Sequence, residues 1–452
     1  MKQTLFFGIL IFFVGHINAQ FAGTPIIVAS TGDVGEFTSL RVVNGNPAIS
    51  YYDRTNGHLM YVHASNFNGN NWETPLAVDT SSNVGLWTSL QIVNGNPAIS
   101  YWDITNGDLK FIRANDANGS VWKTAFKVDT LGNVGAFSSL QIVNGNPAIS
   151  YLDQTNFDLK YIRANDVTGN SWGIPLTLVS IGNIGWYPSL QIVNGYPAIS
   201  FYDVSNRHLK YIRANDMNGL TWGTPQSLDT VGAGAFSSLQ IVNGNPSISY
   251  HAVISNKGHL KYIRANDANG NIWATPLTVD AKDHMGEYTS LQIINGNPAI
   301  SYWGRRDNLK FVRANDANGT IWATPISVDT TNVVGFYSSL QVVNGHPAIS
   351  YWDQNNGNLK YIRSNFPLSL TNTFKTGKVK VYPSVVSNEL RVESYVGTVE
   401  SVELINLTGQ VVFRDKNSHH QPSVNIHHLP RGLYIVRIYT SDEILTEKIF
   451  KE

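Results

Sequence analysis

The chain has 452 residues, with 32 basic and 32 acidic side chains, so its formal net charge is zero. It therefore offers no charge excess for binding nucleic acid or an anionic membrane surface. It contains no cysteine, which excludes disulfides and thiolate metal sites. Its 38 glycines, 11 tryptophans and 21 tyrosines favour many short strands joined by tight turns, with aromatic surface available for contact.

Residues 1–19 have the pattern of a secretory signal peptide. Lys2 precedes an apolar run from Leu5 to Val14, and Ala19 is the small residue before a cleavage site. The run is short for crossing a bilayer, so an uncleaved membrane anchor is the less favoured alternative. The mature chain is expected to begin at Gln20 and to contain no transmembrane segment.

A repeat of about 50 residues occupies residues 20–365. Its most constant part, Asn-Gly-Asn-Pro-Ala-Ile-Ser-Tyr, spans 94–101 in the second copy. Seven prolines mark the copies: Pro47, Pro97, Pro147, Pro197, Pro246, Pro298 and Pro347. A period of this size is typical of solenoids, propellers or arrays, and the lack of helical periodicity argues against helical and leucine-rich solenoids.

One repeat unit contains four expected strands, at 139–143, 147–152, 159–164 and 175–179. Each is rich in Ile, Val, Leu and Tyr and is bounded by turn residues. Four antiparallel strands in about 50 residues are the signature of a β-propeller blade. The sequence therefore predicts an all-β protein with a seven-bladed propeller.

The two ends of the array predict how the ring closes. The last unit, which begins near Tyr337, contains only three strands and stops near Asn365. The missing fourth strand is found at the other end, where 24–28 aligns with 74–78 at an offset of 50 residues. The N-terminal strand is expected to complete the last blade and leave no open edge.

Two sets of aromatic residues recur, and we interpret both mainly as packing between neighbouring blades. The first set precedes the first strand: Phe37, Trp87, Phe137, Tyr187, Phe236, Tyr288 and Tyr337. The second set follows the third strand: Trp72, Trp122, Trp172, Trp222, Trp273 and Trp322.

The turn before each of these tryptophans, Asn-Asp-x-Asn-Gly-x-x-Trp, resembles the Asp-box of sialidase-type propellers. Asp116 lies six residues before Trp122, one more than that pattern allows, so the turn is only Asp-box-like. The resemblance implies a structural turn without chemistry. Calcium binding by its oxygens is a weak alternative, because no closing acidic ligand follows.

Aspartates at the end of the second strand, such as Asp103, and arginines in the third strand, such as Arg113, also recur. They suggest a repeated ion pair, although two repeats keep the arginine without the aspartate. Structural or solvated roles are favoured over catalysis.

Ligand-binding candidates lie on the loops expected at one face of the ring. Aromatic rings beside polar groups suit a sugar, whose apolar face stacks while its hydroxyls form hydrogen bonds. The candidates are Tyr52, Trp102, Tyr202, Trp303, Trp352, Trp186 and Arg305. The irregular repeats add His251, Lys257, Asp283, His284, Arg306 and Asp307 to this face. An ordinary polar surface is the alternative.

The composition changes after residue 365. Residues 366–378 read as a linker, and 379–452 contain short strands expected to form a small Ig-like β-sandwich. This segment resembles the type A C-terminal sorting domain of the type IX secretion system of Bacteroidetes. The motif residues include Tyr382, Pro383, Gly409, Gly432, Tyr434 and Lys448, although Ser384 and Val385 replace the usual Asn-Pro after Tyr-Pro. The resemblance implies export by the type IX machinery, removal of this domain, and release or attachment at the outer-membrane surface.

The near-identity of the repeats favours a secreted, multivalent, lectin-like glycan-binding protein, because repeated sites give avidity. The alternatives are a secreted glycan-degrading or other hydrolase and a protein–protein adhesion scaffold. No catalytic residue, metal site or cofactor is predicted, since no asymmetric carboxylate pair or nucleophile motif is recognisable. The chain is expected to be a monomer.

Overall fold

The computed structural model describes residues 21–451, apart from 283, 306–307, 332, 366–378, 383–384, 387, 395–398, 407–410, 416–422 and 441–443. The expected signal peptide and linker lie outside the described residues. The chain divides into two compact units, Met1–Leu368 and Ser369–Glu452. Every helix or strand element in the described ranges is a β-strand, and none of these residues forms a helix long and apolar enough to cross a membrane.

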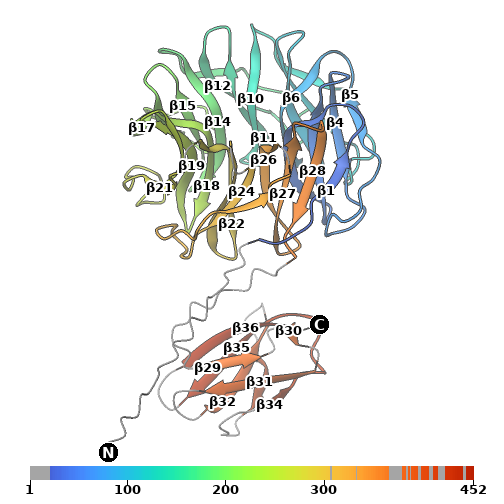
Figure 1. Cartoon of the computed structure of the whole chain (residues 1–452), viewed down its shortest axis with the longest axis vertical. Coiled ribbons are helices and arrows are strands. Elements are labelled where there is room, and N and C mark those ends of the chain that lie inside the picture. Colours follow the sequence, from blue (N-terminus) through green and yellow to red (C-terminus); the bar gives the residue numbers. More distant parts are fainter. Residues whose placement is uncertain are drawn as a thin grey trace, which may run out of the picture. The chain divides into compact units, whose positions relative to one another are not determined.

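The first unit consists of seven four-stranded antiparallel sheets, which are the blades of a β-propeller (Figure 1). Blades 1 to 6 are β2–β5, β6–β9, β10–β13, β14–β17, β18–β21 and β22–β25. Blade 7 is formed by β26, β27, β28 and the N-terminal strand β1. The predicted fold is therefore confirmed, including the number of sheets.

Each blade contains four strands, which we call its first to fourth strands in the order of the sheet. The first strands are β2 (Val34–Val43), β6 (Val84–Val93), β10 (Val134–Val143), β14 (Ile184–Val193), β18 (Ala233–Val242), β22 (Met285–Ile294) and β26 (Val334–Val343). The second strands are β3 (Asn46–Asp53), β7 (Asn96–Asp103), β11 (Asn146–Asp153), β15 (Tyr196–Asp203), β19 (Asn245–Ile254), β23 (Asn297–Gly304) and β27 (His346–Asp353).

The third strands are β4 (His58–His63), β8 (Asp108–Arg113), β12 (Asp158–Arg163), β16 (His208–Arg213), β20 (Lys257–Arg264), β24 (Asn308–Arg313) and β28 (Asn358–Arg363). The fourth strands are β5 (Leu76–Asp79), β9 (Phe126–Asp129), β13 (Leu176–Val179), β17 (Gln226–Asp229), β21 (Leu277–Asp280), β25 (Ile326–Asp329) and β1 (Ile26–Ala29).

Local sequence explains the first hairpin of each blade. In blade 2 the turn residues Asn94 and Gly95 have φ angles of 46° and 81°, which asparagine and glycine tolerate better than other residues. The second strand that follows, β7, is buried along nearly its whole length. Its run of small, β-branched and aromatic residues suits a strand covered on both faces by neighbouring blades.

The hydrophobic core lies between adjacent blades. One cluster, for example, joins Leu59 and Tyr61 of blade 1 with Leu90, Ile99 and Tyr101 of blade 2. Because each sheet buries both faces against its neighbours, no blade is expected to be stable alone.

The ring closes through the N-terminal strand. β1 pairs antiparallel with β28, and Figure 1 shows these two ends of the propeller sequence, blue and orange, side by side. The contact across this junction repeats the contact between other blades: the rings of Trp72 and Tyr361 are 5.1 Å apart, and those of Trp122 and Tyr61 are 5.0 Å apart. Blades 7 and 1 therefore meet as any other neighbours do.

The first strands form the inner wall of the ring. Each contacts the first strands of both neighbouring blades, including β2 with β6 and with β26. Corresponding positions along these strands consequently form layers around a central axis, and the candidate site is built from those layers.

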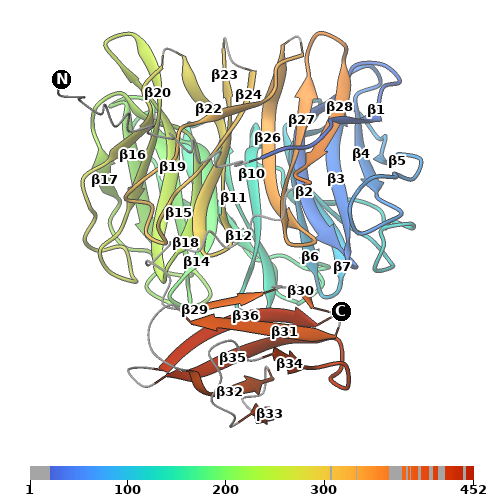
Figure 2. The ribbon, with the colours of Figure 1, turned by 60° about the horizontal axis from the view of Figure 1, so that its bottom comes forward.

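The second unit forms a small β-sandwich, as predicted. One sheet contains β29 (Val379–Tyr382), β31 (Glu389–Ser394) and β34 (Ser423–Asn425). The other contains β30 (Val385–Val386), β36 (Ile444–Lys451), β35 (Gly432–Thr440), β32 (Val399–Ile405) and β33 (Val411–Asp415), of which β35 and β36 are the long pair in Figure 2. Val392 and Val424 of the first sheet pack with Leu404 and Val436 of the second.

Candidate functional site

A β-bulge at the start of each first strand directs an aromatic side chain toward the axis. In blade 1, Glu36 pairs with Tyr52 and Ser39 pairs with Ser50, so two residues of β2 lie opposite one residue of β3. One of these two is Phe37, whose φ is 54°. Positive φ is unfavourable for a bulky side chain, so this conformation stores backbone strain.

The same conformation occurs in all seven blades and creates a closed aromatic ring, which we call the axial aromatic ring. Centroids of adjacent members are 4.0–4.6 Å apart all the way round. Its members, with φ between 51° and 57°, are Phe37, Trp87, Phe137, Tyr187, Phe236, Tyr288 and Tyr337. Packing between neighbouring blades, as predicted for this set, is thus confirmed, but the rings also surround the axis.

A layer of hydroxyl groups next to the ring holds it in place. Thr88 of blade 2 donates to the carbonyl oxygen of Phe37 in blade 1 at 3.0 Å, and the same bond joins Ser138 to Trp87 at 2.9 Å. Equivalent bonds are made by Ser237, Thr289 and Ser338. Each bond links one blade to the backbone of its predecessor at the strained residue, and so stabilises the ring conformation.

The ring and the hydroxyl layer together line a hollow of about 190 Å³ on the axis. Five ring members are half-buried, whereas Phe37 and Phe137 are 9% and 7% exposed. The hollow therefore combines aromatic surface with hydroxyl groups, which is the combination that a small amphipathic ligand requires.

The predicted ligand-binding aromatics flank this ring. Through the bulge register, Trp186 pairs across the strands with Tyr202, and both side chains are half-buried. Phe336 has its centroid 4.4 Å from Trp303 and 5.9 Å from Trp352.

The exposure of the predicted set differs from the expectation of open stacking platforms. Tyr52, Trp102, Trp303 and Trp352 are only 3–8% exposed. Neighbouring side chains cover their rings: Trp102, for example, packs in a cluster with Phe137 and Leu152 of the next blade. Polar groups anchor two of them: Tyr52 donates to Asn83 at 2.7 Å and Trp102 to Asn133 at 3.1 Å. Among the predicted aromatics, Trp186 and Tyr202 keep accessible surface.

Two carboxylates beside the ring, Glu36 and Glu287, were not among the predicted site residues. Glu36 is 7% exposed and accepts a hydrogen bond from Arg54 at 3.1 Å. Burial raises the pKa of Glu36, although the Arg54 charge opposes the shift. Burial also raises the pKa of Glu287, which occupies the same position in blade 6, against the charges of His284 and Arg305.

The predicted residue Arg305 is exposed in the turn after β23, and its influence on the pKa of Glu287 places its charge near that carboxylate. The neighbouring candidates Asp283, Arg306 and Asp307 lie outside the described residues. A signal for the two carboxylates existed in the sequence: they are the only acidic residues at the position directly before an axial ring aromatic.

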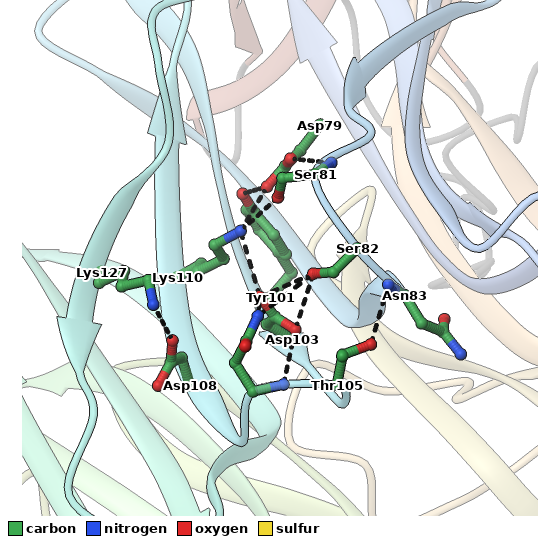
Figure 3. Close-up of polar contacts among 11 residues, drawn as sticks. Asp79, Ser81, Ser82, Asn83, Tyr101, Asp103, Thr105, Asp108, Lys110 and Lys127 are labelled. Atoms are coloured by element: carbon green, nitrogen blue, oxygen red, sulfur yellow. Dashed lines mark hydrogen bonds and ion pairs between the residues drawn. The ribbon is translucent and has the colours of Figure 1, made fainter.

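Buried ion networks lie between the blades and account for many of the remaining charges. Figure 3 shows one of them: the Lys110 amine lies 3.0 Å from Asp79 and 3.2 Å from Asp103, and the Tyr101 hydroxyl donates to Asp79 at 2.6 Å. The predicted pairing of Asp103 with Arg113 is therefore wrong. Arg113 instead donates to two main-chain carbonyl oxygens in the first hairpin of its blade, at 2.8 and 2.9 Å.

The recurring tryptophans of the outer turns have a structural role, as predicted. Trp122 packs edge-on against Tyr61 of the preceding blade, and its indole nitrogen donates to the Gly119 carbonyl at 2.7 Å. Asp116 accepts hydrogen bonds from the backbone of Asn118, Ser120 and Val121. The aspartate oxygens are thus occupied in fixing the turn.

The described residues contain no group of three or more His, Asp or Glu side chains arranged to hold a metal ion. His251, which the sequence placed on the ligand face, is close enough to His259 and His284 for their charges to matter. Burial lowers the pKa of His251 to about 4, with those two charges adding to the shift.

In the C-terminal unit, Tyr434 is buried and donates to the Pro430 carbonyl at 2.8 Å. Tyr382, Gly432 and Lys448 lie in β29, β35 and β36. Pro383 and Gly409 lie outside the described residues.

Comparison with solved structures gives distant likenesses. The NanB sialidase from Streptococcus pneumoniae is 13% identical with a TM-score of 0.45, over 76% of this chain and 71% of that one. AofleA from Arthrobotrys oligospora is 12% identical with a TM-score of 0.44, over 68% and 90%. An exo-β-1,3-galactanase from Phanerochaete chrysosporium is 10% identical with a TM-score of 0.37, over 75% and 96%. At these values none of them bears on what this chain binds.

No curated protein matches the chain. Residues 380–452, in contrast, match the family described as the secretion system C-terminal sorting domain. This match confirms the resemblance seen in the sequence and indicates a protein that is secreted or attached to the outer-membrane surface after processing. The second unit of the chain is a C-terminal sorting domain for the type IX secretion machinery.

Proposed function

We propose that the propeller is a glycan-binding module whose ligand enters the axial aromatic ring. The observation that carries the proposal is the ring itself: seven bulky residues keep a positive φ around one hollow. Such strain is costly at each position and is commonly retained at ligand sites. Small residues or glycine would close the same bulges with less strain.

The chemistry of the hollow fits a sugar. Half-buried rings such as Tyr187 and Trp186 offer stacking surface for the apolar face of a pyranose. The hydroxyl layer offers partners for its hydroxyl groups. Glu36 and Glu287 are not part of the lining of the hollow, but their charges add to the effect of burial in raising the pKa of the ring member Tyr288, so both carboxylates lie near the rim of the hollow. A hollow of about 190 Å³ suits one terminal sugar ring rather than a long internal segment of polysaccharide.

This arrangement favours one composite site on the axis over seven separate pockets. The number of ligands bound per chain therefore distinguishes a single axial site from the multivalent, lectin-like binding that the repeats suggest. One ligand per chain supports the axial site, whereas several ligands per chain support independent sites between blades.

The test is a glycan-array screen on the purified protein, followed by calorimetry with a glycan that binds. In Tyr187→Asn the new asparagine tolerates the positive φ, while one aromatic side chain of the axial aromatic ring is lost. Trp186→Ala removes an aromatic side chain that flanks this ring. Both variants are expected to weaken binding at least tenfold. Trp222→Phe is the matched control, because Trp222 packs against Tyr161 in an outer turn, away from the axial aromatic ring. This variant is expected to bind the glycan like the parent protein.

Unchanged affinity in Tyr187→Asn and Trp186→Ala would reject the axial site. A screen that finds no glycan at high protein concentration would reject glycan binding and favour a protein–protein adhesion scaffold.

A second candidate function, glycan hydrolysis, is favoured by the raised pKa values of the Glu36 and Glu287 carboxyls. A glycosidase needs one carboxyl that stays protonated as an acid, together with a second carboxylate in another role. Glu36→Gln and Glu287→Gln separate the two functions. Release of sugar by the parent protein, abolished in either variant with binding retained, would establish the hydrolase.

A further inference from the structure

A second cavity, of about 140 Å³, lies on the propeller axis beyond the hydroxyl layer. It is lined by two polar layers of the first strands. One layer has a serine from every blade: Ser39, Ser89, Ser139, Ser189, Ser238, Ser290 and Ser339. The other has a glutamine in the later blades but Arg41 in blade 1. We call this cavity the axial channel.

Each serine hydroxyl of the channel accepts a hydrogen bond through its oxygen but donates none through its proton to any described residue. Ser39 accepts the backbone N–H of Leu90 in the next blade at 3.1 Å. The same bond recurs at 3.0–3.1 Å around the ring and closes it from Leu40 to Ser339. A hydroxyl that accepts one hydrogen bond can still donate another, and no bond among the described residues uses these seven protons.

The glutamines form a chain of neutral amides along their layer. Gln91 donates to Gln141 at 2.9 Å, Gln141 to Gln191 at 3.2 Å, and Gln191 to Gln240 at 3.1 Å. Arg41 replaces the glutamine of blade 1 and so introduces one positive charge into an otherwise neutral lining.

That charge has no carboxylate partner within the part of the chain that the structure describes. Arg41 donates to the main-chain oxygen of Leu40 at 3.0 Å, and none of the ion pairs between described residues includes it. Burial alone lowers the pKa of Arg41 to about 10, so the guanidinium stays protonated at neutral pH. Arg41 is half-buried in the channel wall. A charge held partly out of water without a counter-ion is unfavourable, and an anion from solvent would offset it.

We propose that the axial channel binds a small inorganic anion, held by the Arg41 guanidinium and by hydroxyl protons of the serine layer. The class includes chloride and compact oxyanions such as sulfate, which accept hydrogen bonds only and fit a cavity of this size. The site is separate from the aromatic ring and does not depend on glycan binding.

The anion is expected to join the blades where their inner strands meet. Its removal should therefore loosen the propeller rather than change the ligand hollow. Any ligand bound by the folded state alone raises its stability in proportion to the logarithm of its concentration above the dissociation constant.

The first measurement is the melting temperature of the full chain at constant ionic strength, with chloride or sulfate replacing a bulky organic anion that cannot enter the channel. The parent protein is expected to show a saturable rise in Tm. Arg41→Gln, which completes the glutamine layer, is expected to show none. Arg363→Gln is the control: Arg363 donates to main-chain oxygens of its own blade and lies outside the channel lining, so its chloride response should match that of the parent.

A second variant, Gln341→Glu, places a carboxylate in the same layer in the blade next to Arg41. This fixed charge should replace the anion and also abolish the chloride response, so the test remains decisive where Arg41→Gln does not fold. Anomalous scattering from bromide-soaked crystals of the full chain should then give a peak beside Arg41. Equal anion responses in the parent and both variants, or a bromide-free channel, would overturn the proposal.

Discussion

The hydroxyl of Thr88 donates to the carbonyl oxygen of Phe37, two residues in adjacent blades whose atoms lie 3.0 Å apart. Phe37 has a φ of 54°, so this bond holds a strained residue in place from the neighbouring sheet. The same Thr88 hydroxyl lies 2.7 Å from that of Ser50 in blade 1. The ring geometry is therefore a property of pairs of blades and not of any single blade.

Removal of this link should destabilise the propeller. Thr88→Val keeps the shape of the side chain but leaves the buried Phe37 carbonyl and Ser50 hydroxyl without their partner. We expect a loss of about 2 kcal/mol in the free energy of unfolding, measured by denaturant titration.

The chain offers a matched control for this change. In blade 4 a proline, Pro188, occupies the position of Thr88, and the Ser150 hydroxyl is consequently buried without a partner. Ser150→Ala should therefore leave the stability unchanged or raise it slightly. A large loss in Ser150→Ala, or none in Thr88→Val, would contradict this account of the hydroxyl layer.

The buried ion networks should behave as coupled units. Lys110→Met leaves the Asp79 and Asp103 carboxylates, both under 10% exposed, without their counter-ion. A cost of about 3–5 kcal/mol is expected for an uncompensated buried charge.

Blade 1 shows how this cost is avoided, because there Met60 replaces the lysine and Ala29 replaces the Asp79 equivalent. Asp79→Ala together with Lys110→Met should therefore cost clearly less than the sum of the two single changes. A double-mutant cycle in denaturant measures the coupling. Additive costs would show that the two residues act independently.

Much of the fold could be predicted because the same pattern of strands and turns occurs in seven copies of the repeat. The second strands and their Asn-Gly turns are local features, and the closure by residues 24–28 follows from an offset of 50 residues. The bulge at Phe37 could not be predicted. Glu36 to Ser39 read as a continuous strand, and the contact that accompanies the positive φ of Phe37, the bond from Thr88, comes from the next blade. Phe137 keeps a φ of 57° although Pro188 offers no hydroxyl there, so packing around the axis also contributes.

The candidate site was predicted only in part for the same reason. Trp186 does contact the ring member Phe137 and pairs with Tyr202, but the burial of Trp102, Trp303 and Trp352 depends on side chains that are distant in sequence. The partner of Lys110 is likewise non-local, since Asp79 lies 31 residues away in the preceding blade. One signal was available within the chain. Where Ala29 replaces the aspartate, Met60 replaces the lysine, and where Val179 replaces it, Phe201 replaces the tyrosine, although Tyr51 and Lys210 are kept.

Two glycines of blade 2 that both have positive φ should differ in the cost of substitution: Gly119 lies in an outer turn and Gly95 in the turn of the first hairpin. At Gly119 (φ 77°) a Cβ atom would lie 2.7 Å from the Tyr61 ring, whereas at Gly95 (φ 81°) it would meet nothing within 4 Å. Gly95→Ala should cost about 1 kcal/mol from the backbone conformation alone. Gly119→Ala should cost about 1–3 kcal/mol more, because the added methyl group displaces the contact between blades. Equal midpoints of urea denaturation for the two variants would refute this difference.

Acid should weaken the propeller through its aspartates. Burial by itself raises the pKa of Asp79, but hydrogen bonds from Tyr101, Ser81 and Lys110 outweigh it and lower the pKa below the usual 3.8. Asp329 of blade 6 follows the same pattern, with bonds from Thr331 and from Tyr351 and Lys360 of blade 7. A carboxyl whose pKa is lower in the folded state gives stability that is present above the unfolded pKa and is lost as the pH falls through the folded pKa.

The free energy of unfolding should therefore decrease steeply below about pH 4. Glu36 and Glu287 act in the opposite direction, because their raised pKa values give stability at low pH that is lost as the pH rises. The lowered group is larger, since the turn aspartates Asp116, Asp166, Asp216, Asp267 and Asp316 belong to it as well. Denaturant titrations of the parent and of Asp329→Asn between pH 2 and pH 7 measure the slopes. The variant should be less stable at pH 7 but lose less between pH 5 and pH 2, because it takes up one proton fewer on unfolding. Parallel curves would show that the Asp329 network contributes nothing to the acid sensitivity.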